Sequence, residues 1–238
     1  MLEKDGYNVK PFQKYFTSDG LAAGRILVIS NALNERNTED WALPAYSAFT
    51  DEEIVQVGEW VKNGGSLFLI ADHMPFPGAA EKLAGKFGFK LNNGFAFDTS
   101  KKASPDLFTR KDKTLGKNFI TNGSNKSEYV DSIYSFTGEA FQIPGDAVPV
   151  LTLNENFVSF MPDTAWNFRE TTKKMSAAGW LQGAVMKYGK GRVAVWGEAA
   201  MFSAQTANGR NFGMNAPYAK YNAQLLLNII HWLDGRFN

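Results

Sequence analysis

The stretch that decides the fold runs from Phe49 to Gly78 and reads FTDEEIVQVGEWVKNGGSLFLIADHMPFPG. Thr50 and Glu53 have the spacing of a capping box, in which each side chain bonds a backbone N–H at the start of a helix. The pair Gly64-Gly65 can accept the left-handed backbone that ends a helix. A helix is therefore predicted between these signals, with a buried face made of Ile54, Val57, Trp60 and Val61.

A strand covered on both faces is predicted directly after this helix. Residues 66–71 form a short and almost wholly apolar run, which is typical of a buried parallel strand. The polar pair Asp72-His73 follows, and then come two prolines and Gly78. Open α/β sheets bind ligands beyond the carboxyl ends of their strands. The stretch therefore locates a candidate site, although it does not name a reaction.

Two more predicted strands end in polar residues in the same way. Residues 25–30 close on Ser30-Asn31, and residues 191–196 are followed by Gly197-Glu198. Parallel strands deliver the loops that follow them to one edge of the sheet, and right-handed crossovers leave little freedom to place a loop elsewhere. We therefore expect one crevice, lined by Asp72, His73 and Glu198 and rimmed by Asn31 and Asn215.

These residue types allow two chemical interpretations. Asp, His and Glu together can bind a divalent metal or perform acid–base chemistry, so Asp72, His73 and Glu198 are the candidate catalytic residues. No pair has a recognised metal-ligand spacing, and the identity of any metal or cofactor stays open. In the structural alternative, Asp72 caps the following loop or helix and His73 is a hydrogen-bonded structural residue. The candidate ligand-binding residues are Asn31 and, in the loop before the last helix, Gln205, Arg210 and Asn215.

The composition excludes several classes of protein. The 238 residues carry 25 Lys and Arg against 24 Asp and Glu, so a net charge of +1 gives no reason to expect a nucleic-acid partner. No apolar run approaches the roughly 18 residues needed to cross a bilayer, and there is no N-terminal signal pattern. Because the chain has no cysteine, disulfides and thiolate nucleophiles are excluded. The compartment and the oligomeric state stay open.

The rest of the chain predicts further elements around this centre. We expect helices over residues 79–87 and 215–233, with Pro217 in the first turn of the second one, and a strand over residues 89–97. Residues 180–188 and 191–196 are predicted to form a hairpin across Gly189-Lys190-Gly191.

The N-terminal residues and the middle of the chain depart from this pattern. Residues 1–6 resemble the last turn of a helix and residues 7–12 a strand of the sheet, so we expect an incomplete N-terminus in which an earlier strand and helix are absent. Residues 99–175 are predicted to be an irregular, β-rich insertion, with short strands at residues 134–136, 147–152 and 157–161. Its basic part, residues 101–126, is interpreted as a solvated loop.

Two segments carry a resemblance to a known family. They read DEEIVQVGEWVKNGGSLFLIADH (residues 51–73) and GKGRVAVWGEAAMFSAQ…FGMNAPYAKYNAQLLLNIIHWLDG (residues 189–235). The chain resembles a group of uncharacterised bacterial proteins related to the class I glutamine amidotransferase-like superfamily, over roughly residues 7–98 and 179–235. The resemblance implies an α/β fold: a three-layer sandwich with a flavodoxin-like, mostly parallel sheet, as a single domain over residues 1–238 that includes the insertion.

The same resemblance argues against the superfamily's own reaction. Its amidotransferases place a cysteine on a tight strand-to-helix turn, where this chain has Ala71-Asp72-His73-Met74. They also place a His-Glu pair after a later strand, where this chain keeps Glu198 between Gly197 and Ala199. We therefore expect a non-catalytic domain that binds a small polar molecule such as a carbohydrate. The alternative is a hydrolase that uses Asp72, His73 and Glu198 as metal ligands or acid–base groups.

Overall fold

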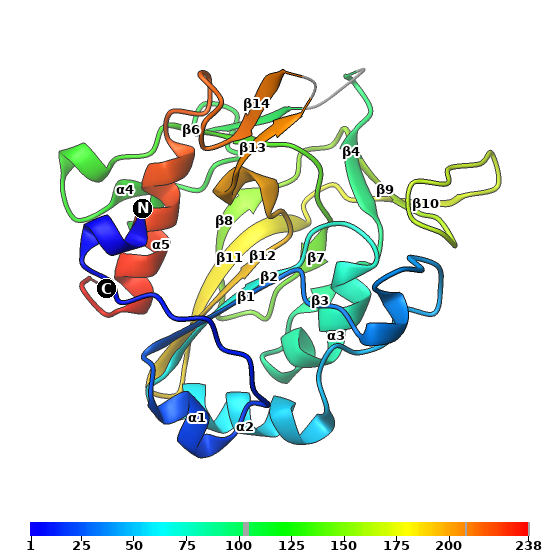
Figure 1. Ribbon diagram of the computed structural model, residues 1–238. Coiled ribbons are helices and arrows are strands. Elements are labelled where there is room, and N and C mark those ends of the chain that lie inside the picture. Colours follow the sequence, from blue (N-terminus) through cyan, green and yellow to red (C-terminus); the bar gives the residue numbers. More distant parts are fainter. Residues whose placement is uncertain (102–104, 208, 238) are drawn as a thin grey trace.

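A mixed sheet of seven strands forms the centre of the protein. The computed structural model describes residues 1–101, 105–207 and 209–237 (Figure 1). Along the sheet the order is β1 (Ile26–Ser30), β2 (Ser66–Ile70), β12 (Gly191–Trp196), β11 (Leu181–Tyr188), β7 (Phe141–Gln142) and β3 (Lys90–Leu91), and β8 (Val148–Thr152) also pairs with β11. The strands β1, β2 and β12 are parallel, whereas β11, β7, β3 and β8 pair antiparallel.

Three smaller sheets surround this one. They are β10 (Lys173–Ser176), β9 (Phe157–Met161) and β4 (Phe95–Asp98); β13 (Ala204–Ala207) with β14 (Arg210–Gly213); and β5 (Asp106–Thr109) with β6 (Ser132–Ser135). The helices are α1 (Ser18–Ala22), α2 (Asp51–Lys62), α3 (Phe76–Lys86), α4 (Phe119–Asn122) and α5 (Asn222–Leu233), and the 3-10 turns are η1 (Leu2–Asp5), η2 (Glu35–Asn37), η3 (Lys126–Glu128) and η4 (Ala200–Phe202). No helix within the described ranges is both long and apolar enough to cross a membrane.

The strand β2 joins two hydrophobic clusters because its side chains alternate between the faces of the sheet. Leu67 and Leu69 belong to the cluster that includes α2 and α3, whereas Phe68 belongs to the cluster that includes α5. All five residues of β2 are buried. Figure 1 shows α5 on one side of the sheet and α1, α2 and α3 on the other. This confirms a buried strand directly before Asp72-His73.

The capping box that set the start of α2 is confirmed. Thr50 accepts a hydrogen bond from the Glu53 N–H, and the Glu53 carboxylate accepts one from the Thr50 N–H. The same carboxylate also accepts a hydrogen bond from the Phe16 N–H. Glu53 therefore also ties the segment before α1 to the start of α2.

Two predictions about the sheet are wrong. The sheet is mixed rather than mostly parallel. The hairpin makes β11 and β12 antiparallel, and β7, β8 and β3 also pair antiparallel with their neighbours. Residues 7–12 form no strand: residues 8–12 are exposed, and Pro11 has no N–H to donate to a ladder. Residues 1–6 do form a helical turn, η1, which ends at Gly6 in a left-handed conformation (φ 92°).

Several predicted boundaries also differ. The strand expected over residues 89–97 is interrupted at residues 92–94, so that β3 and β4 lie in different sheets. The helix α3 begins at Phe76 rather than past Gly78, and α5 begins at Asn222, so that Pro217 precedes it. Gly78 therefore lies inside α3, and Pro217 lies before α5 rather than in its first turn.

The middle segment is rich in strands, and two of them belong to the central sheet. The short strands expected at 134–136, 147–152 and 157–161 correspond to β6, β8 and β9. Because β7 and β8 pair with β11, this part of the chain completes the sheet as well as covering it. The basic part contains β5 and α4, and residues 102–104 of it lie outside the described residues.

Candidate functional site

Asp72 lies at the carboxyl end of β2, where it joins the loops that follow β1 and β12. Its carboxylate accepts hydrogen bonds from the backbone N–H groups of His73 and Ala199. The Asn31 side chain hydrogen-bonds the Asp72 carboxylate and also accepts a bond from the Asp72 N–H at 3.0 Å. Asn31 has a left-handed backbone (φ 52°), which asparagine tolerates better than most residues. The structure therefore brings Asp72, Asn31 and the loop of Glu198 together, as parallel strand ends require.

Glu198 is fully buried and bonds the backbone through both of its carboxylate oxygens. Oε1 accepts from the Ala200 N–H at 2.6 Å and Oε2 from the Met201 N–H at 2.8 Å, while the Phe136 N–H bonds the same carboxylate. These bonds hold the start of η4. Glu198 therefore performs a structural task that occupies both oxygens.

A third carboxyl group, that of Glu139, lies beside this loop. The Glu139 N–H donates to the carbonyl of Gly197, and its Oε2 accepts from the Asn92 N–H at 2.9 Å. Its Oε1 is buried and has no hydrogen-bond partner among the described residues. The sequence does not indicate Glu139, because it lies in a connection between short strands that shows no periodic pattern. The adjacent Gly138 is a sequence signal for a close backbone approach at this position.

Burial and mutual repulsion keep these three carboxyl groups protonated at higher pH than usual. Burial raises the pKa of Asp72 to about 7, against the hydrogen bonds from His73, Ala199 and Asn31, which lower it. Burial also raises the pKa values of Glu139 and Glu198 well above the usual range, and the nearby charge of Asp72 adds to both effects. Within the described ranges no three His, Asp or Glu side chains are placed to hold a metal ion together.

His73 points away from the carboxyl groups into a cluster of aromatic rings. Its ring stacks on Phe95 with centroids 4.5 Å apart and meets the edge of Trp166 at 4.7 Å. Trp41 and Phe76 lie about the same imidazole, with centroids 6.1 and 5.9 Å away. Burial lowers the pKa of His73, so the ring is neutral at pH 7.

The hydrogen bonding of His73 leaves one ring nitrogen free. Nδ1 lies 2.8 Å from the carbonyl oxygen of Met74, and a neutral imidazole that donates from Nδ1 keeps a lone pair on Nε2. In the described part of the chain, Nε2 has no hydrogen-bond partner. His73 is therefore oriented through Nδ1, and the residue as a whole is 9% exposed.

Trp166 covers this imidazole from the loop between β9 and β10. Its side chain is 52% exposed, and its backbone is left-handed (φ 66°), an uncommon and strained conformation for a bulky residue. The loop is bound to the residues around Trp41 by two backbone hydrogen bonds. The Leu43 N–H donates to the Asp163 carbonyl, and the Ala165 N–H donates to the Trp41 carbonyl. Strained backbone conformations of this kind cluster at active sites and ligand clamps.

The other predicted ligand residues, Gln205, Arg210 and Asn215, belong to the β13–β14 hairpin and the loop after it. Gln205 and Arg210 are exposed on the β13–β14 hairpin, and Asn215 donates from Nδ2 to the Gln205 carbonyl. Within the described residues, no hydrogen bond or ion pair links Gln205, Arg210 or Asn215 to Asp72, His73 or Glu198. The hairpin packs against the neighbourhood of Glu198 through Phe212, whose ring lies 5.7 Å from that of Phe136, and a role for this loop over the crevice stays a prediction.

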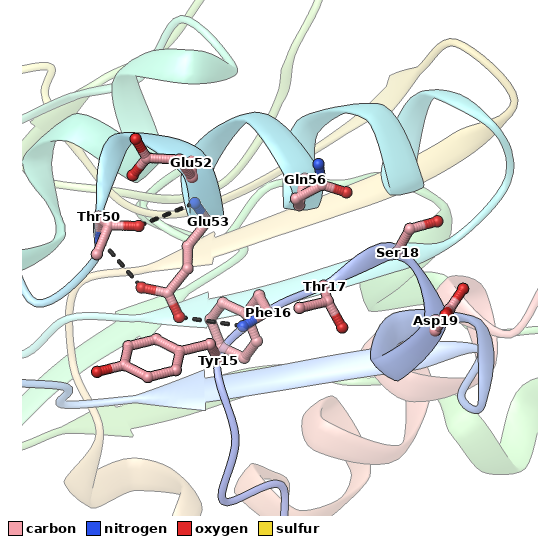
Figure 2. Close-up of a pocket in the computed structure, with 9 residues that line it drawn as sticks. All are labelled: Tyr15, Phe16, Thr17, Ser18, Asp19, Thr50, Glu52, Glu53 and Gln56. Carbon is pink, nitrogen blue, oxygen red and sulfur yellow. Dashed lines mark hydrogen bonds between the residues drawn. The ribbon is translucent and has the colours of Figure 1, made fainter.

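Cavities formed by the described residues include two that lie elsewhere on the surface. One, of about 450 Å³, lies between α1 and the start of α2, and Tyr15, Asp19 and Glu52 are among the residues that line it (Figure 2). The other, of about 170 Å³, lies on the β9–β10 loop, which also carries Trp166. Neither cavity is lined by Asp72, His73 or Glu198.

Comparison with known proteins identifies the fold alone. No protein-family model and no curated protein matches the chain. Among solved structures, the N-terminal domain of mmIFT52 is similar with a TM-score of 0.65 and 14% identity, over 98% of this chain and 87% of that one. The cytoplasmic proteins STM3548 and STM1381 of Salmonella typhimurium are similar at 16% and 14% identity, with TM-scores of 0.56 and 0.53. These matches cover 98% and 92% of this chain, and 83% and 75% of those chains.

Proposed function

We propose that this protein is a non-catalytic domain that binds a small polar molecule, a carbohydrate in particular, at the rings around His73. In this proposal the domain is an amidotransferase-like, three-layer, flavodoxin-like sandwich that has no cysteine nucleophile. The observation that carries the proposal is the free Nε2 of His73 beneath the half-exposed ring of Trp166. A sugar presents C–H groups that pack on an indole face and hydroxyls that donate to an imidazole nitrogen.

The alternative, a hydrolase that uses Asp72, His73 and Glu198, has less support. A catalytic carboxylate needs a free oxygen within hydrogen-bond reach of its substrate, and both oxygens of Glu198 are bonded to backbone N–H groups. The pKa of Asp72, about 7, suits a general acid or base, but its carboxylate is likewise occupied by Asn31, His73 and Ala199. Binding without catalysis requires none of these bonds to break.

A thermal-shift panel of neutral monosaccharides and divalent metal salts tests the proposal. We expect a sugar to raise the melting temperature in proportion to the logarithm of its concentration above its Kd. Trp166→Ala and His73→Ala should each weaken that Kd by about tenfold, because each removes about one ring contact or one hydrogen bond. Tyr15→Ala is the matched control, since Tyr15 is also an exposed aromatic residue (74%) but lies at the larger cavity, between α1 and α2.

The outcomes separate the two candidate functions. A sugar-specific shift that Trp166→Ala weakens and Tyr15→Ala does not would support the binding domain. A metal-specific shift that is lost in His73→Ala would favour the hydrolase instead. If no sugar shifts the melting temperature, the proposed function is wrong.

A further inference from the structure

The smaller cavity, on the β9–β10 loop, has a lining that suits an anion. It measures about 170 Å³, below the roughly 300–1,000 Å³ of pockets that enclose a whole ligand, so it fits one group of a larger molecule. Most of its lining consists of polar and charged side chains, among them Asp163, Thr164, Asn167, Arg169, Thr172 and Lys173. Figure 1 shows the β9–β10 hairpin projecting at one side of the molecule, next to β4.

Two cations line this cavity without an acidic partner. Within the described residues, neither Arg169 nor Lys173 has a carboxylate within salt-bridge distance. The single acidic side chain in the lining, Asp163, leaves an excess of one positive charge. A guanidinium and an ammonium beside threonine hydroxyls can bind a carboxylate or a phosphate.

The cavity and the proposed sugar site share one short loop. Trp166, which covers His73, is followed directly by Asn167, which lines the cavity, and Arg169 comes two residues later. The Arg169 N–H donates to the Thr172 hydroxyl at 2.8 Å and the Thr172 N–H donates to the Arg169 carbonyl at 3.0 Å, which closes a turn between these two lining residues. Trp166 and the two cations therefore belong to one segment, residues 166–173.

We propose that the ligand of this protein is acidic, a uronic acid or a sugar phosphate, and that Arg169 and Lys173 bind its anionic group. This rests on the proposed function, since it assigns the charge of the ligand bound at Trp166. The bond to the anion is electrostatic and lies near the surface, so it weakens as salt screens it.

Calorimetric titration of the full chain with glucose, glucuronate, glucose 6-phosphate and inorganic phosphate tests the assignment. We expect at least one acidic sugar to bind tenfold or more tightly than glucose at 20 mM salt, and this preference to shrink at 500 mM. Arg169→Gln and Lys173→Gln should remove most of the preference and leave the Kd for glucose unchanged. Lys111→Gln, which removes an exposed cation from the turn after β5, is the matched control and should have no effect.

Each of the other possible results of the titration contradicts either the anion site, the acidic-sugar assignment or the sugar site. Equal affinities for glucose and the acidic sugars, with glucose binding lost in Trp166→Ala, would overturn the anion site and leave the proposed function standing. Binding of inorganic phosphate alone, lost in Arg169→Gln, would overturn the acidic-sugar assignment and the sugar site together. An acidic-sugar preference that persists in both Gln variants would place the anion elsewhere and overturn the assignment.

Discussion

Asp72, Glu139 and Glu198 are buried carboxyl groups at one edge of the sheet, and protonation is what allows them to stay there. The pKa of Asp72 rises from 3.8 to about 7 on folding, so the native state holds a proton that the unfolded state loses above pH 4. The contribution of this group to stability is therefore fully present below pH 4 and is lost as the pH rises through 7.

Asp72→Asn removes that dependence because an amide does not ionise. We expect the unfolding free energy of the variant, relative to the wild type, to rise between pH 4 and pH 8 by on the order of 4 kcal/mol, at about 1.4 kcal/mol for each pKa unit. Urea denaturation across this range measures the difference. Asp146→Asn, in an exposed turn, is the control; a difference between Asp72→Asn and the wild type that does not change with pH would contradict the argument.

Glu139 gives a second test at the same edge. Its pKa is raised well above the usual range, so ionisation at high pH destabilises the folded chain, whereas Glu139→Gln stays neutral. We expect Glu139→Gln to be within about 1 kcal/mol of the wild type at pH 6 and more stable than the wild type at pH 9. Chemical denaturation at the two pH values decides this. A variant that is equally destabilised at both would show that the charge of Glu139 plays no part.

At the scale of elements, two strand-end loops approach each other through glycines. A Cβ added to Gly138 would lie 2.1 Å from the Gly197 carbonyl oxygen and 2.9 Å from the Glu198 Cβ. Neither partner is a flexible side-chain end, so backbone would have to move. We expect Gly138→Ala to destabilise the protein by several kcal/mol, in the manner of an overpacked core.

Gly145→Ala is the matched control for this substitution. Gly145 lies in the turn after β7, and a Cβ there would meet no atom within 4 Å. The variant should unfold within about 0.5 kcal/mol of the wild type, or slightly above it, because alanine restricts the unfolded chain. Similar urea midpoints for Gly138→Ala and Gly145→Ala would mean that the loop of Glu198 can move to accommodate the added Cβ at little cost in stability.

The sequence predicted those elements whose signals are local. The capping box at Thr50 and Glu53, the buried strand β2 and the two-residue hairpin between β11 and β12 each depend on a few neighbouring residues. Residues 7–12 alternate in the way a strand does but find no partner, and pairing is not encoded locally. The same limit explains why β3 and β4, read as one strand, lie in two sheets.

The candidate site was predicted in part for the same reason. Strand ends locate Asp72, His73, Glu198 and Asn31, because parallel strands fix where their loops go. Glu139 and Trp166 come from the irregular middle segment, where no period indicates which side chains point inward. Gln205, Arg210 and Asn215 lie in the loop between Glu198 and the last helix, and their part in the site stays a prediction.

Across the whole molecule, the two hydrophobic clusters share one sheet and should unfold together. Leu69 lies in the cluster of α2 and α3, while Trp196 and Trp232 lie in the cluster on the α5 side. Leu69→Ala should lower the unfolding free energy by about 3 kcal/mol. Tryptophan fluorescence and far-UV circular dichroism should report the same shifted midpoint in urea. Midpoints that separate would show that the two faces unfold independently.

The position of β2 has a kinetic consequence for the proposed site. Its amides are hydrogen-bonded between β1 and β12 and covered on both faces, so they should exchange with deuterium only when the entire domain opens. His73 lies three residues after the end of this strand, whereas Trp166 belongs to a surface loop whose backbone bonds to Trp41 and Leu43 can open without unfolding the sheet. In the proposed site, the contact with His73 therefore lies beside the slowest-exchanging strand, and the contact with Trp166 lies on a loop that can open locally. A bound molecule would then be released by motion of the tryptophan side while the histidine side stays in place.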